Sequence, residues 1–459
     1  MRTDQVNTQS PLNGVKKVKT YFIFTFGCQM NEHDSEVMAA LLEGLGFSPT
    51  EKLEKADLII INTCAVRKKP EDKVASLLGK LAPLKNINKD LIIAVTGCMS
   101  QQRETAFHLK ERFPFVDLIT GTHALPRLPS HITMIMELEQ HKTIVDIEED
   151  YAEREGLPVR HSSFFKAWLP VNYGCNNFCS YCIVPYVRGR ERSRKMGHII
   201  AEAKSLAEKG YVEITLLGQN VNSYGHDLPG KPTFAALLKE MDQINGLARI
   251  RFMTSHPKDL SSELIKTVNE GEKICEHFHL PVQSGSNRIL RLMKRQYSRE
   301  KYSSLVREIR KEIPGVSVTT DLIVGFPGER EEDFKDTLSL INEIRFDNAF
   351  SFLYSPRNNT KAALLTDAIN RQEKESRLKR LNNLQHCISK EVNEPLVGRT
   401  VEVLVEGTSK NKPDMKTGRT RTNKLVHFPA YGDLTGLLVR VVIKEARTWD
   451  LIGEIETKN

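Results

Sequence analysis

The sequence predicts an α/β protein in three parts: an N-terminal parallel α/β domain, a partial or full TIM-type barrel, and a small C-terminal β-barrel. Three observations support this prediction. Apolar runs alternate with helical patterns near the N-terminus, about six further βα units follow, and residues 399–456 alternate Val, Leu and Ile with polar residues. The 459 residues are also enough for roughly two to four domains.

Each expected strand of the N-terminal sheet is a short apolar run that ends in a cysteine. The runs are Tyr21 to Cys28, Leu58 to Cys64 and Leu91 to Cys98. Helical patterns over 34–45 and 71–84 lie between them, as in βαβ units. The runs are apolar almost throughout, which is typical of a parallel sheet covered on both faces.

The second βα series is predicted to form the barrel. Its candidate strands are 167–173, 213–217, 249–253, 277–281, 317–324 and 349–354. Helical patterns over 198–209, 258–270, 287–294 and 299–311 separate them. Such a barrel carries its active site at the carboxyl ends of its strands. A charged amphipathic helix over 371–392 then leads to the C-terminal β-barrel, whose alternating pattern is typical of small barrels.

The bulk composition is that of a soluble globular protein, with 40% hydrophobic residues, 27% charged residues and a net charge of +8. No apolar run approaches the roughly 18 residues that span a bilayer. Residues 1–18 are polar and basic, lack the apolar core of a secretory signal, and are expected to be disordered. We therefore expect a cytoplasmic protein, in which clustered cysteines are metal ligands rather than disulfides. The positive charge indicates an acidic partner, with nucleic acid as one candidate.

The segment from Gly174 to Cys182 is the strongest chemical signal. Cys175, Cys179 and Cys182 place three thiolates within eight residues, directly after the first barrel strand. Thiolates ligate iron–sulfur cubes, and a full [4Fe-4S] cluster takes four ligands. The missing ligand leaves one iron open, and we expect it to bind the amino and carboxylate groups of S-adenosylmethionine (SAM). The alternative is a zinc site, but zinc normally needs a second CxxC knuckle or histidines, and the adjacent sequence offers neither.

Cys28, Cys64 and Cys98 share a position at the ends of the three N-terminal strands. A lone cysteine is most often a small buried hydrophobe. In a parallel sheet, however, the three strand ends lie on one edge, where ligands bind. We expect these cysteines to hold a second cluster, again with one iron unfilled, that faces the first across a shared pocket. Cys275 and Cys387 have no comparable partners and are expected simply to pack.

Together these motifs resemble the methylthiotransferase family of radical-SAM enzymes. The matching strings are 25–36, 61–67, 96–101, 173–194 and 418–424, in matching order between about residues 19 and 456. The resemblance implies four segments after residue 18: a methylthiotransferase domain (19–147), a linker (148–160), a radical-SAM core (161–394) and a TRAM domain (395–459). It also assigns the SAM cluster to Cys175, Cys179 and Cys182, and an auxiliary cluster to the other three cysteines.

The resemblance further implies the reaction, which is methylthiolation of adenine C2 in N6-dimethylallyladenosine, next to the anticodon (position 37) of tRNA. This C2–H is neither acidic nor a leaving group, so a cofactor-borne radical route fits it better than acid–base catalysis. In the family the first cluster cleaves SAM to a 5′-deoxyadenosyl radical, the second supplies sulfur, and another SAM supplies methyl. The implied partners are tRNA carrying dimethylallyladenosine, an electron donor such as flavodoxin or ferredoxin, and a sulfur donor. No membrane is involved, and the protein is expected to be a monomer.

The barrel also offers candidate contacts to SAM. Gly218, Gln219 and Asn220 end one candidate strand, where related enzymes hold the amino group of SAM. Gln283 and Glu329 follow two other strand ends, the latter in a Gly-Phe-Pro-Gly-Glu string. The alternative is that Pro-Gly in a βα loop is ordinary turn chemistry.

Two groups of basic residues are candidate RNA contacts. The first group alternates beside the cysteine loop and contains Arg188, Arg190, Arg192 and Arg194. The second group lies in the C-terminal barrel and contains Lys410, Lys412, Lys416, Arg419, Arg421 and Lys424. Such residues can contact phosphates. The alternatives are a solvated charged face for the first group and a solubilising hairpin for the second.

Three other functions remain open at this stage. Related methylthiotransferases act on threonylcarbamoyladenosine in tRNA or on an aspartate of a ribosomal protein. The strings 29–34 and 419–424 favour dimethylallyladenosine over both. A different class is a non-catalytic RNA-binding protein stabilised by a structural metal, and this class predicts zinc and no cleavage of SAM.

Overall fold

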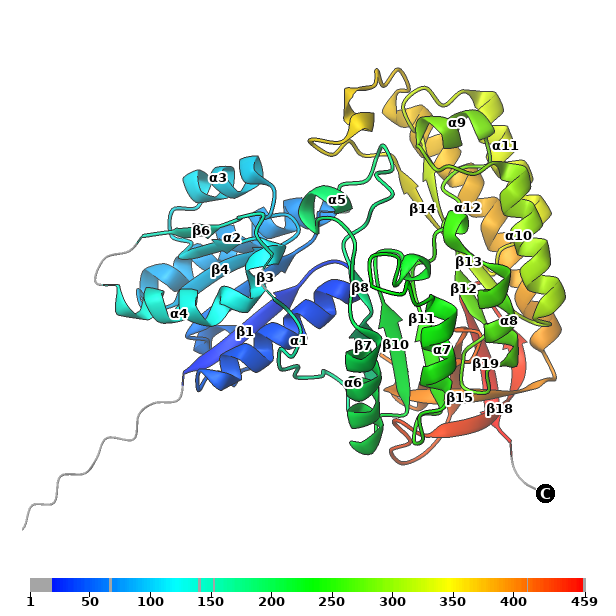
Figure 1. Ribbon diagram of the computed structural model, residues 1–459, viewed down its shortest axis with the longest axis horizontal. Helices are drawn as coiled ribbons and strands as arrows, with labels where there is room; N and C mark the ends of the chain where they lie inside the picture. The colour runs from blue at the N-terminus through cyan, green and yellow to red at the C-terminus, as the bar shows by residue number, and fades with distance from the viewer. Residues whose placement is uncertain (1–18, 66–67, 139–141, 152, 411, 457–459) are drawn as a thin grey trace, which may run out of the picture.

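The computed structural model describes residues 19–65, 68–138, 142–151, 153–410 and 412–456. The expected disordered segment 1–18 lies outside these residues. Figure 1 shows three parts: an N-terminal α/β layer structure, a larger βα half-barrel and a small closed β-barrel. The predicted α/β class is therefore confirmed. No helix in the described part of the chain is long and apolar enough to cross a membrane.

The N-terminal sheet is fully parallel, with strand order β2-β1-β3-β4-β5-β6. Its strands are β1 Thr20–Thr25, β2 Ser48–Pro49, β3 Leu58–Thr63, β4 Ile92–Gly97, β5 Leu118–Thr120 and β6 Ile144–Asp146. Its helices are α1 Gln29–Gly44, α2 Lys68–Ile87, α3 Arg103–Arg112 and α4 Leu128–Glu137. Alternate residues of β3 enter two separate apolar clusters. Ile59 and Ile61 pack with α2 and α3, whereas Leu58 and Ile60 pack with α1 and α4, so helices cover both faces.

The middle domain is a half-barrel of six parallel strands. In barrel order the strands are β7 Lys166–Pro170, β10 Glu213–Leu217, β11 Arg249–Phe252, β12 His277–His279, β13 Ser317–Val324 and β14 Asn348–Leu353. A single bridge between Ile250 and Ile274 joins its two halves. Among the described residues no strand pairing closes β7 onto β14, so the barrel is partial rather than full.

Helices cover the outer wall of the half-barrel. They are α6 Met196–Glu208, α7 Phe234–Asp242, α8 Ser262–Glu270, α9 Asn287–Leu292, α10 Arg299–Glu312, α11 Glu331–Ile344 and α12 Arg371–Asn393. The short helix α5 Val184–Val187 lies instead between the half-barrel and the N-terminal domain (Figure 1). Short 3-10 helices occur at 53–55, 122–127, 221–223, 257–259, 361–364 and 394–396.

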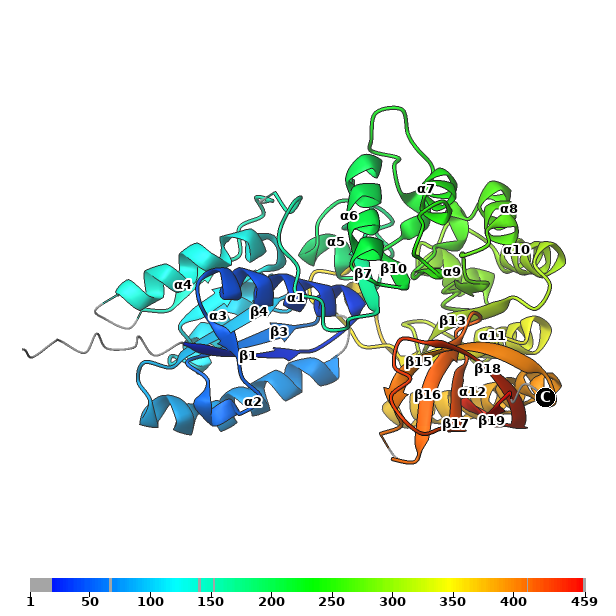
Figure 2. The same ribbon diagram turned by 90° about the horizontal axis from the view of Figure 1, so that it is seen from below.

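The C-terminal strands close into a five-stranded barrel in the order β15-β16-β17-β19-β18. They are β15 Thr400–Thr408, β16 Met415–Thr420, β17 Leu425–Pro429, β18 Leu438–Ala446 and β19 Asp450–Ile455. Figure 2 shows this barrel beside the half-barrel, and Figure 1 shows it at the end where the strands of the half-barrel begin. Two buried arginines of β11 fix it there. Arg249 donates to the Arg419 carbonyl at 2.7 Å, and Arg251 donates to the Thr420 carbonyl at 2.7 Å.

Candidate active site

The cysteine loop leaves the half-barrel at the carboxyl end of β7. A two-stranded antiparallel ladder of β8 Asn172–Tyr173 and β9 Arg192–Ser193 closes the base of this loop. At Gly174, φ is +75° and a Cβ atom would lie 2.1 Å from the Arg190 carbonyl oxygen. Only glycine fits this position, where the chain turns into the loop. The loop therefore has a defined conformation and lies at the active-site end of the barrel.

The three thiols of the loop lie close together and are shielded from water. Cys175 and Cys179 are buried and Cys182 is partly buried. Burial and the neighbouring thiol of Cys179 raise the pKa of Cys175 to about 11 and that of Cys182 to about 12. Without a metal these two thiols are protonated near neutral pH, and ligation has to displace their protons. Three converging thiols on a short loop fit an iron–sulfur cube, whose usual ligands are thiolates.

Among the described residues no three His, Cys, Asp or Glu side chains come close enough to share one metal ion. An iron–sulfur cube asks for a different arrangement, because each cysteine binds its own iron.

The second set of cysteines lies where the N-terminal strands end. Cys28 directly precedes α1 and is exposed, whereas Cys64 and Cys98 directly follow β3 and β4 and are buried. Gly27 allows the first and second strand ends to approach, because a Cβ atom there would lie 2.7 Å from the Cys64 Cβ. The structure therefore places all three at one edge of the sheet, as expected for parallel strands.

Asn31, on the first turn of α1, connects this second set. The thiols of Cys28 and Cys98 lie 3.6 and 3.9 Å from its Oδ1 atom. Its Nδ2 atom donates to the carbonyls of Phe26 and Thr63 at 2.9 and 2.8 Å, which fixes the side chain between the strand ends. Burial, together with the neighbouring thiols of Cys64 and Cys28, raises the pKa of Cys98 to about 12 although Arg188 opposes this shift. These thiols are therefore mutual neighbours.

Arg188 joins the two cysteine sets across the domain boundary. Its Nη2 atom donates to Asn31 Oδ1 at 2.9 Å and pairs with Asp34 Oδ2 at 2.8 Å, and all three side chains are buried. Burial alone would raise the pKa of Asp34, but Arg188 and Arg154 outweigh it and lower the pKa to about 2. Removal of one partner from such a buried pair costs about 3–5 kcal/mol, so this pair is a strong constraint on domain placement.

An apolar contact lies beside this ion pair. Cys98 and Ala65 of the N-terminal domain pack against Ile183 and Val187, which follow the cysteine loop. Because Ile183 is the residue after Cys182, the two cysteine sets belong to one continuous region of the molecule.

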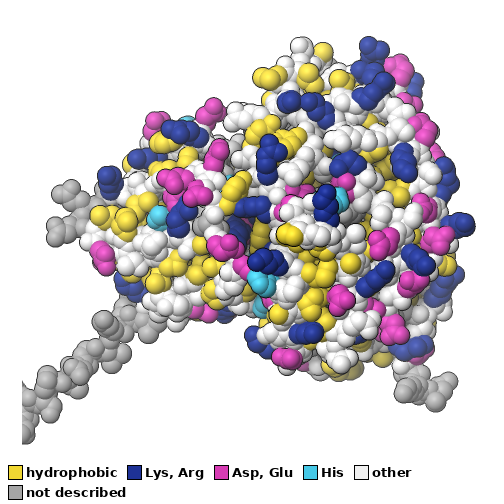
Figure 3. All heavy atoms as spheres, viewed as in Figure 1, with side chains coloured by type: hydrophobic (Ala, Val, Ile, Leu, Met, Phe, Trp, Pro, Cys, Tyr) yellow, Lys and Arg dark blue, Asp and Glu magenta, His cyan; other side chains and the backbone are white. Residues whose placement is uncertain are grey.

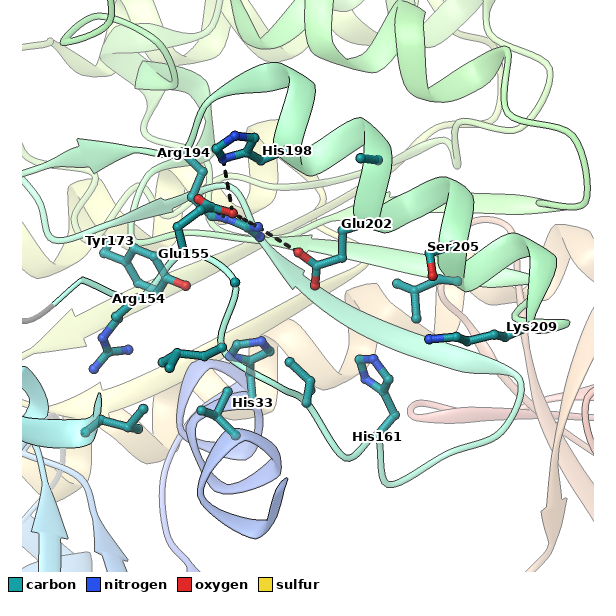
Figure 4. A pocket seen from close by; sticks show the side chains of 17 residues that line it. His33, Arg154, Glu155, His161, Tyr173, Arg194, His198, Glu202, Ser205 and Lys209 are labelled. Atoms are coloured by element: carbon teal, nitrogen blue, oxygen red, sulfur yellow. Dashed lines mark hydrogen bonds and ion pairs between the residues drawn. The ribbon is translucent and has the colours of Figure 1, made fainter. Parts of the chain in front are cut away.

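A cavity of about 460 Å³ opens between α1, the segment 154–161 and α6. Figure 4 shows that its polar wall includes a group of paired charges. Arg194 lies 2.7 Å from Glu202, and its Nε atom donates to Glu155 at 3.1 Å. His198 lies 3.6 Å from Glu155. The cavity thus lies between the two domains, and residues of the linker form part of its wall. None of the cysteines lines it.

A smaller cavity of about 250 Å³ adjoins the cysteine loop. Its lining residues are Asn176, Asn177, Glu191, Ser223, His226, Asp227, Lys258, Asp259 and Gln296. Glu191 is buried, one of its carboxylate oxygens has no hydrogen-bond partner, and burial raises its pKa to about 7. A polar cavity with a perturbed carboxyl beside Cys175 is a candidate ligand site.

The expected SAM contacts lie at strand ends, but two of them already have internal partners. Asn220 donates to Asp259 at 2.7 Å and accepts from the His256 N–H at 3.0 Å. Glu329 is buried and accepts from the Gly325 N–H at 2.8 Å and from Arg377 at 3.0 Å. Gly218 and Gln219 follow β10, and Gln283 follows β12. Gln283 is a buried non-glycine residue with φ of +72°, an unusual conformation that often marks functional positions.

Most arginines of the first basic group interact with other residues of the protein. Arg188 and Arg194 are held by the ion pairs described above, and Arg192 lies 3.5 Å over the Tyr151 ring. Arg190 is exposed, with its guanidinium 5.3 Å from the Phe178 ring. Of this group, Arg190 is therefore the residue best placed to meet a large ligand.

In the second basic group, three residues form ion pairs within the protein, and no ion pair is seen for the other three among the described residues. Arg421 pairs with Glu276 at 2.6 Å, and Lys424 pairs with Asp347 at 2.5 Å, so both attach the β-barrel to the half-barrel. Arg419 lies 3.5 Å from Glu406 within the small barrel. Lys410 and Lys412 are exposed, and Lys416 is partly buried beside Thr408. On the face drawn in Figure 3, basic and acidic side chains are interspersed.

The other two cysteines differ from each other. Cys275 is buried, as expected, whereas Cys387 is exposed on α12, so the prediction that it packs is wrong. The roles of Asn31, Asp34 and Glu191 were not predicted from the sequence. Asn31 and Asp34 lie inside the matching string 25–36 and Glu191 inside 173–194, and these strings were the only local signal for the three residues.

Three protein families match consecutive parts of the chain. The uncharacterized protein family UPF0004 matches residues 20–121, the Radical SAM superfamily residues 169–341, and the TRAM domain residues 395–455. A half-barrel with a three-cysteine loop at its carboxyl end, followed by a TRAM barrel, defines a radical-SAM enzyme. SAM and a [4Fe-4S] cluster are the cofactors of this class.

Curated relatives narrow the class. The chain is 53% identical over 441 residues to the tRNA-2-methylthio-N(6)-dimethylallyladenosine synthase of Moorella thermoacetica, with 96% of this chain and 99% of that one covered. It is 51% identical over 450 residues to the protein of the same name from Acetivibrio thermocellus, covering 97% and 93%. The chain belongs to the family of tRNA-2-methylthio-N(6)-dimethylallyladenosine synthases.

Solved structures support the fold. The radical SAM methyltransferase TsrM from Kitasatospora setae aligns with a TM-score of 0.55 at 15% identity, covering 86% of this chain and 81% of that one. At this identity the likeness concerns the fold alone.

Proposed function

We propose that this chain transfers a methylthio group to adenine C2 of N6-dimethylallyladenosine at position 37 of tRNA. The observation that carries the proposal is its identity of 53% and 51% to synthases so named, over nearly their full length. The arrangement of the two cysteine sets agrees with a reaction that needs both a radical source and a sulfur source.

In this proposal Cys175, Cys179 and Cys182 hold the cluster that binds SAM, and Cys28, Cys64 and Cys98 hold the auxiliary cluster. When bound, the two clusters and SAM supply the radical, the sulfur and the methyl group. The chain contributes the placement of these groups. Asn31 and Arg188 hold the strand ends of one domain against the loop of the other. The apolar patch around Ile183 excludes water from the contact.

For SAM itself we propose contacts from Gly218, Gln219 and Gln283. Asn220 and Glu329 do not belong to this proposed set, because their side chains already form internal hydrogen bonds. Glu191 is a further proposed contact, because its carboxyl faces the cavity beside Cys175 and lacks a partner for one oxygen. As a carboxylate it would accept from the SAM amino group.

We propose domain boundaries at 19–147, 161–394 and 395–459, with 148–160 as the linker. The three family matches each fall within one of these ranges. We further propose that the protein works as a monomer in the cytoplasm, with tRNA as substrate. An electron donor such as flavodoxin or ferredoxin, and a separate sulfur donor, complete the proposed set of partners.

The test is mass spectrometry of tRNA nucleosides from a strain that lacks the gene. The 2-methylthio group should disappear from isopentenyladenosine, while the prenylated nucleoside accumulates, and a plasmid copy should restore it. An unchanged isopentenyladenosine derivative would contradict the proposal. Loss of methylthio from threonylcarbamoyladenosine, or from a ribosomal protein aspartate, would identify one of the two related activities instead.

The proposed RNA contacts in the TRAM barrel are the exposed Lys410 and Lys412 and the partly buried Lys416, none of which forms an ion pair among the described residues. Replacing Lys410, Lys412 and Lys416 together by alanine should weaken tRNA binding, since each phosphate contact releases counterions. The slope of log Kd against log salt should fall by about 2 to 3 if all three lysines contact phosphate. Filter binding or fluorescence anisotropy over a salt series measures both quantities.

A matched control removes the same charge from the outer wall of the half-barrel. The lysines Lys239, Lys266 and Lys311 lie on helices α7, α8 and α10 and are exposed there. Their triple alanine variant should keep the salt slope of the wild-type protein. Equal slopes for the two triple variants would assign tRNA binding to another surface.

A further inference from the structure

Arg295 follows α9 and lies buried directly beside the cysteine loop, with 4% of its surface exposed. Its guanidinium donates to four acceptors. Nε donates to the Tyr297 hydroxyl at 2.8 Å, and Nη2 donates to the Pro281 carbonyl at 2.6 Å. Nη1 donates to the Tyr181 hydroxyl and to Cys179 Sγ, both at 3.4 Å. The side chain is thus held in place with one N–H group directed at a cysteine sulfur.

None of these four acceptors is a carboxylate. In the described part of the chain no Asp or Glu forms an ion pair with Arg295. Other buried arginines of this chain do have such partners: Arg188 pairs with Asp34 and Arg251 with Glu213. A buried charge is costly unless it is paired. The compensating negative charge must therefore come from a group at the cysteine loop.

We propose that Arg295 is the counter-charge of the cluster held by Cys175, Cys179 and Cys182, and that it raises the reduction potential of this cluster. The three thiolates make the loaded site anionic, and reduction adds one further negative charge. A fixed cation stabilises the more negative state more strongly, and hydrogen bonds to cluster sulfurs act in the same direction. Arg295 is a positioning residue, because it contacts Cys179, a cysteine ligand of the cluster, and acts on the cluster through it.

The proposal rests on the proposed function only through the cluster itself, so it is tested without tRNA. The full-length protein and its Arg295→Gln variant are reconstituted anaerobically, and the reduced cluster is followed by electron paramagnetic resonance during a redox titration. The signal of this cluster is the one that changes shape when SAM is added. In Arg295→Gln the equilibrium constant for reduction should fall at least about tenfold, which is about 59 mV for a one-electron couple. Arg295→Lys keeps the charge and should retain most of the wild-type potential.

The matched control is Arg291→Gln, one turn earlier on α9. Arg291 is exposed, and its Nε atom donates to the Asn287 carbonyl. This variant should titrate like the wild-type protein. Equal potentials for Arg295→Gln and Arg291→Gln would overturn the proposal.

Iron content and thermal unfolding are measured in parallel. If Arg295→Gln takes up no iron, the Arg295→Lys variant decides. If Arg295→Lys has the wild-type reduction potential, the counter-charge proposal is supported. If its equilibrium constant for reduction falls tenfold or more, or if it also takes up no iron, the proposal is overturned. A wrong substrate assignment would change the tRNA nucleosides but leave these potentials as they are, so the two failures are distinguishable.

Discussion

Replacing Cys175 by alanine should abolish cleavage of SAM, down to the level of protein-free controls. The iron content should fall from about eight to about four per chain, because each cube of this kind carries about four irons. The fold should survive, since the Gly174 turn and the β8–β9 ladder that shape the loop do not use the Cys175 side chain. Anaerobic reconstitution, iron and sulfide analysis, and chromatographic measurement of 5′-deoxyadenosine give the result.

Cys387→Ala is the control for this experiment. Cys387 is exposed on α12 and belongs to neither cysteine set, so its removal should change neither iron content nor SAM cleavage. If the Cys175 variant kept about eight irons and normal cleavage, the loop would not hold the cluster. If the protein carried zinc in place of iron and no variant cleaved SAM, the chain would instead be a non-catalytic RNA-binding protein with a structural metal.

The parts that the sequence predicted well are those with local signals. Each N-terminal strand that delivers a cysteine is a largely apolar run, and the cysteine comes within three residues of the end of the strand, so the register of strand and ligand is local. The strands β2, β5 and β6 have only two or three residues each and carry no recognisable pattern. Their place in the sheet depends on neighbours that are distant in the chain.

Helix α1 shows why a polar active site displaces predicted boundaries. The helix begins at Gln29 instead of the expected residue 34. Its first turns contain Asn31, His33 and Asp34, which are polar residue types, yet all three are buried. They are buried because they face the other domain, where Arg188 satisfies two of them.

The arginines were the hardest residues to interpret from sequence. A series of basic residues beside an active site predicted phosphate contacts, but the partner of Arg188 is Asp34, 154 positions away in the chain. The partner of Arg421 is Glu276, 145 positions away. No local pattern encodes such long-range pairs, so a charge run cannot be divided into internal pairs and free cations before the fold is known.

Replacing Cys98 by alanine should separate the two halves of the reaction. Cys98 lies in the N-terminal domain beside Asn31 and is not one of the three cysteines of the loop, so SAM cleavage should persist. Two remaining thiolates are too few to retain an iron–sulfur cube that already lacks one ligand. The iron content should therefore fall to about four per chain, and the methylthio product should be absent from tRNA nucleosides.

The stability of this variant is expected to change little, because the substitution removes one sulfur atom from a small apolar patch and typical single substitutions cost about 1 kcal/mol. Cys275→Ala is the matched control, because Cys275 is equally buried but lies in the half-barrel without thiol neighbours. It should keep its full complement of iron and its full methylthiolation activity. If Cys98→Ala methylthiolated tRNA at the rate of Cys275→Ala, the sulfur would have to come from elsewhere, and the N-terminal strand ends would be structural only. If it instead lost SAM cleavage as well, Cys98 would act on the first cluster through the contact of its patch with Ile183, and the two cysteine sets would form a single functional unit.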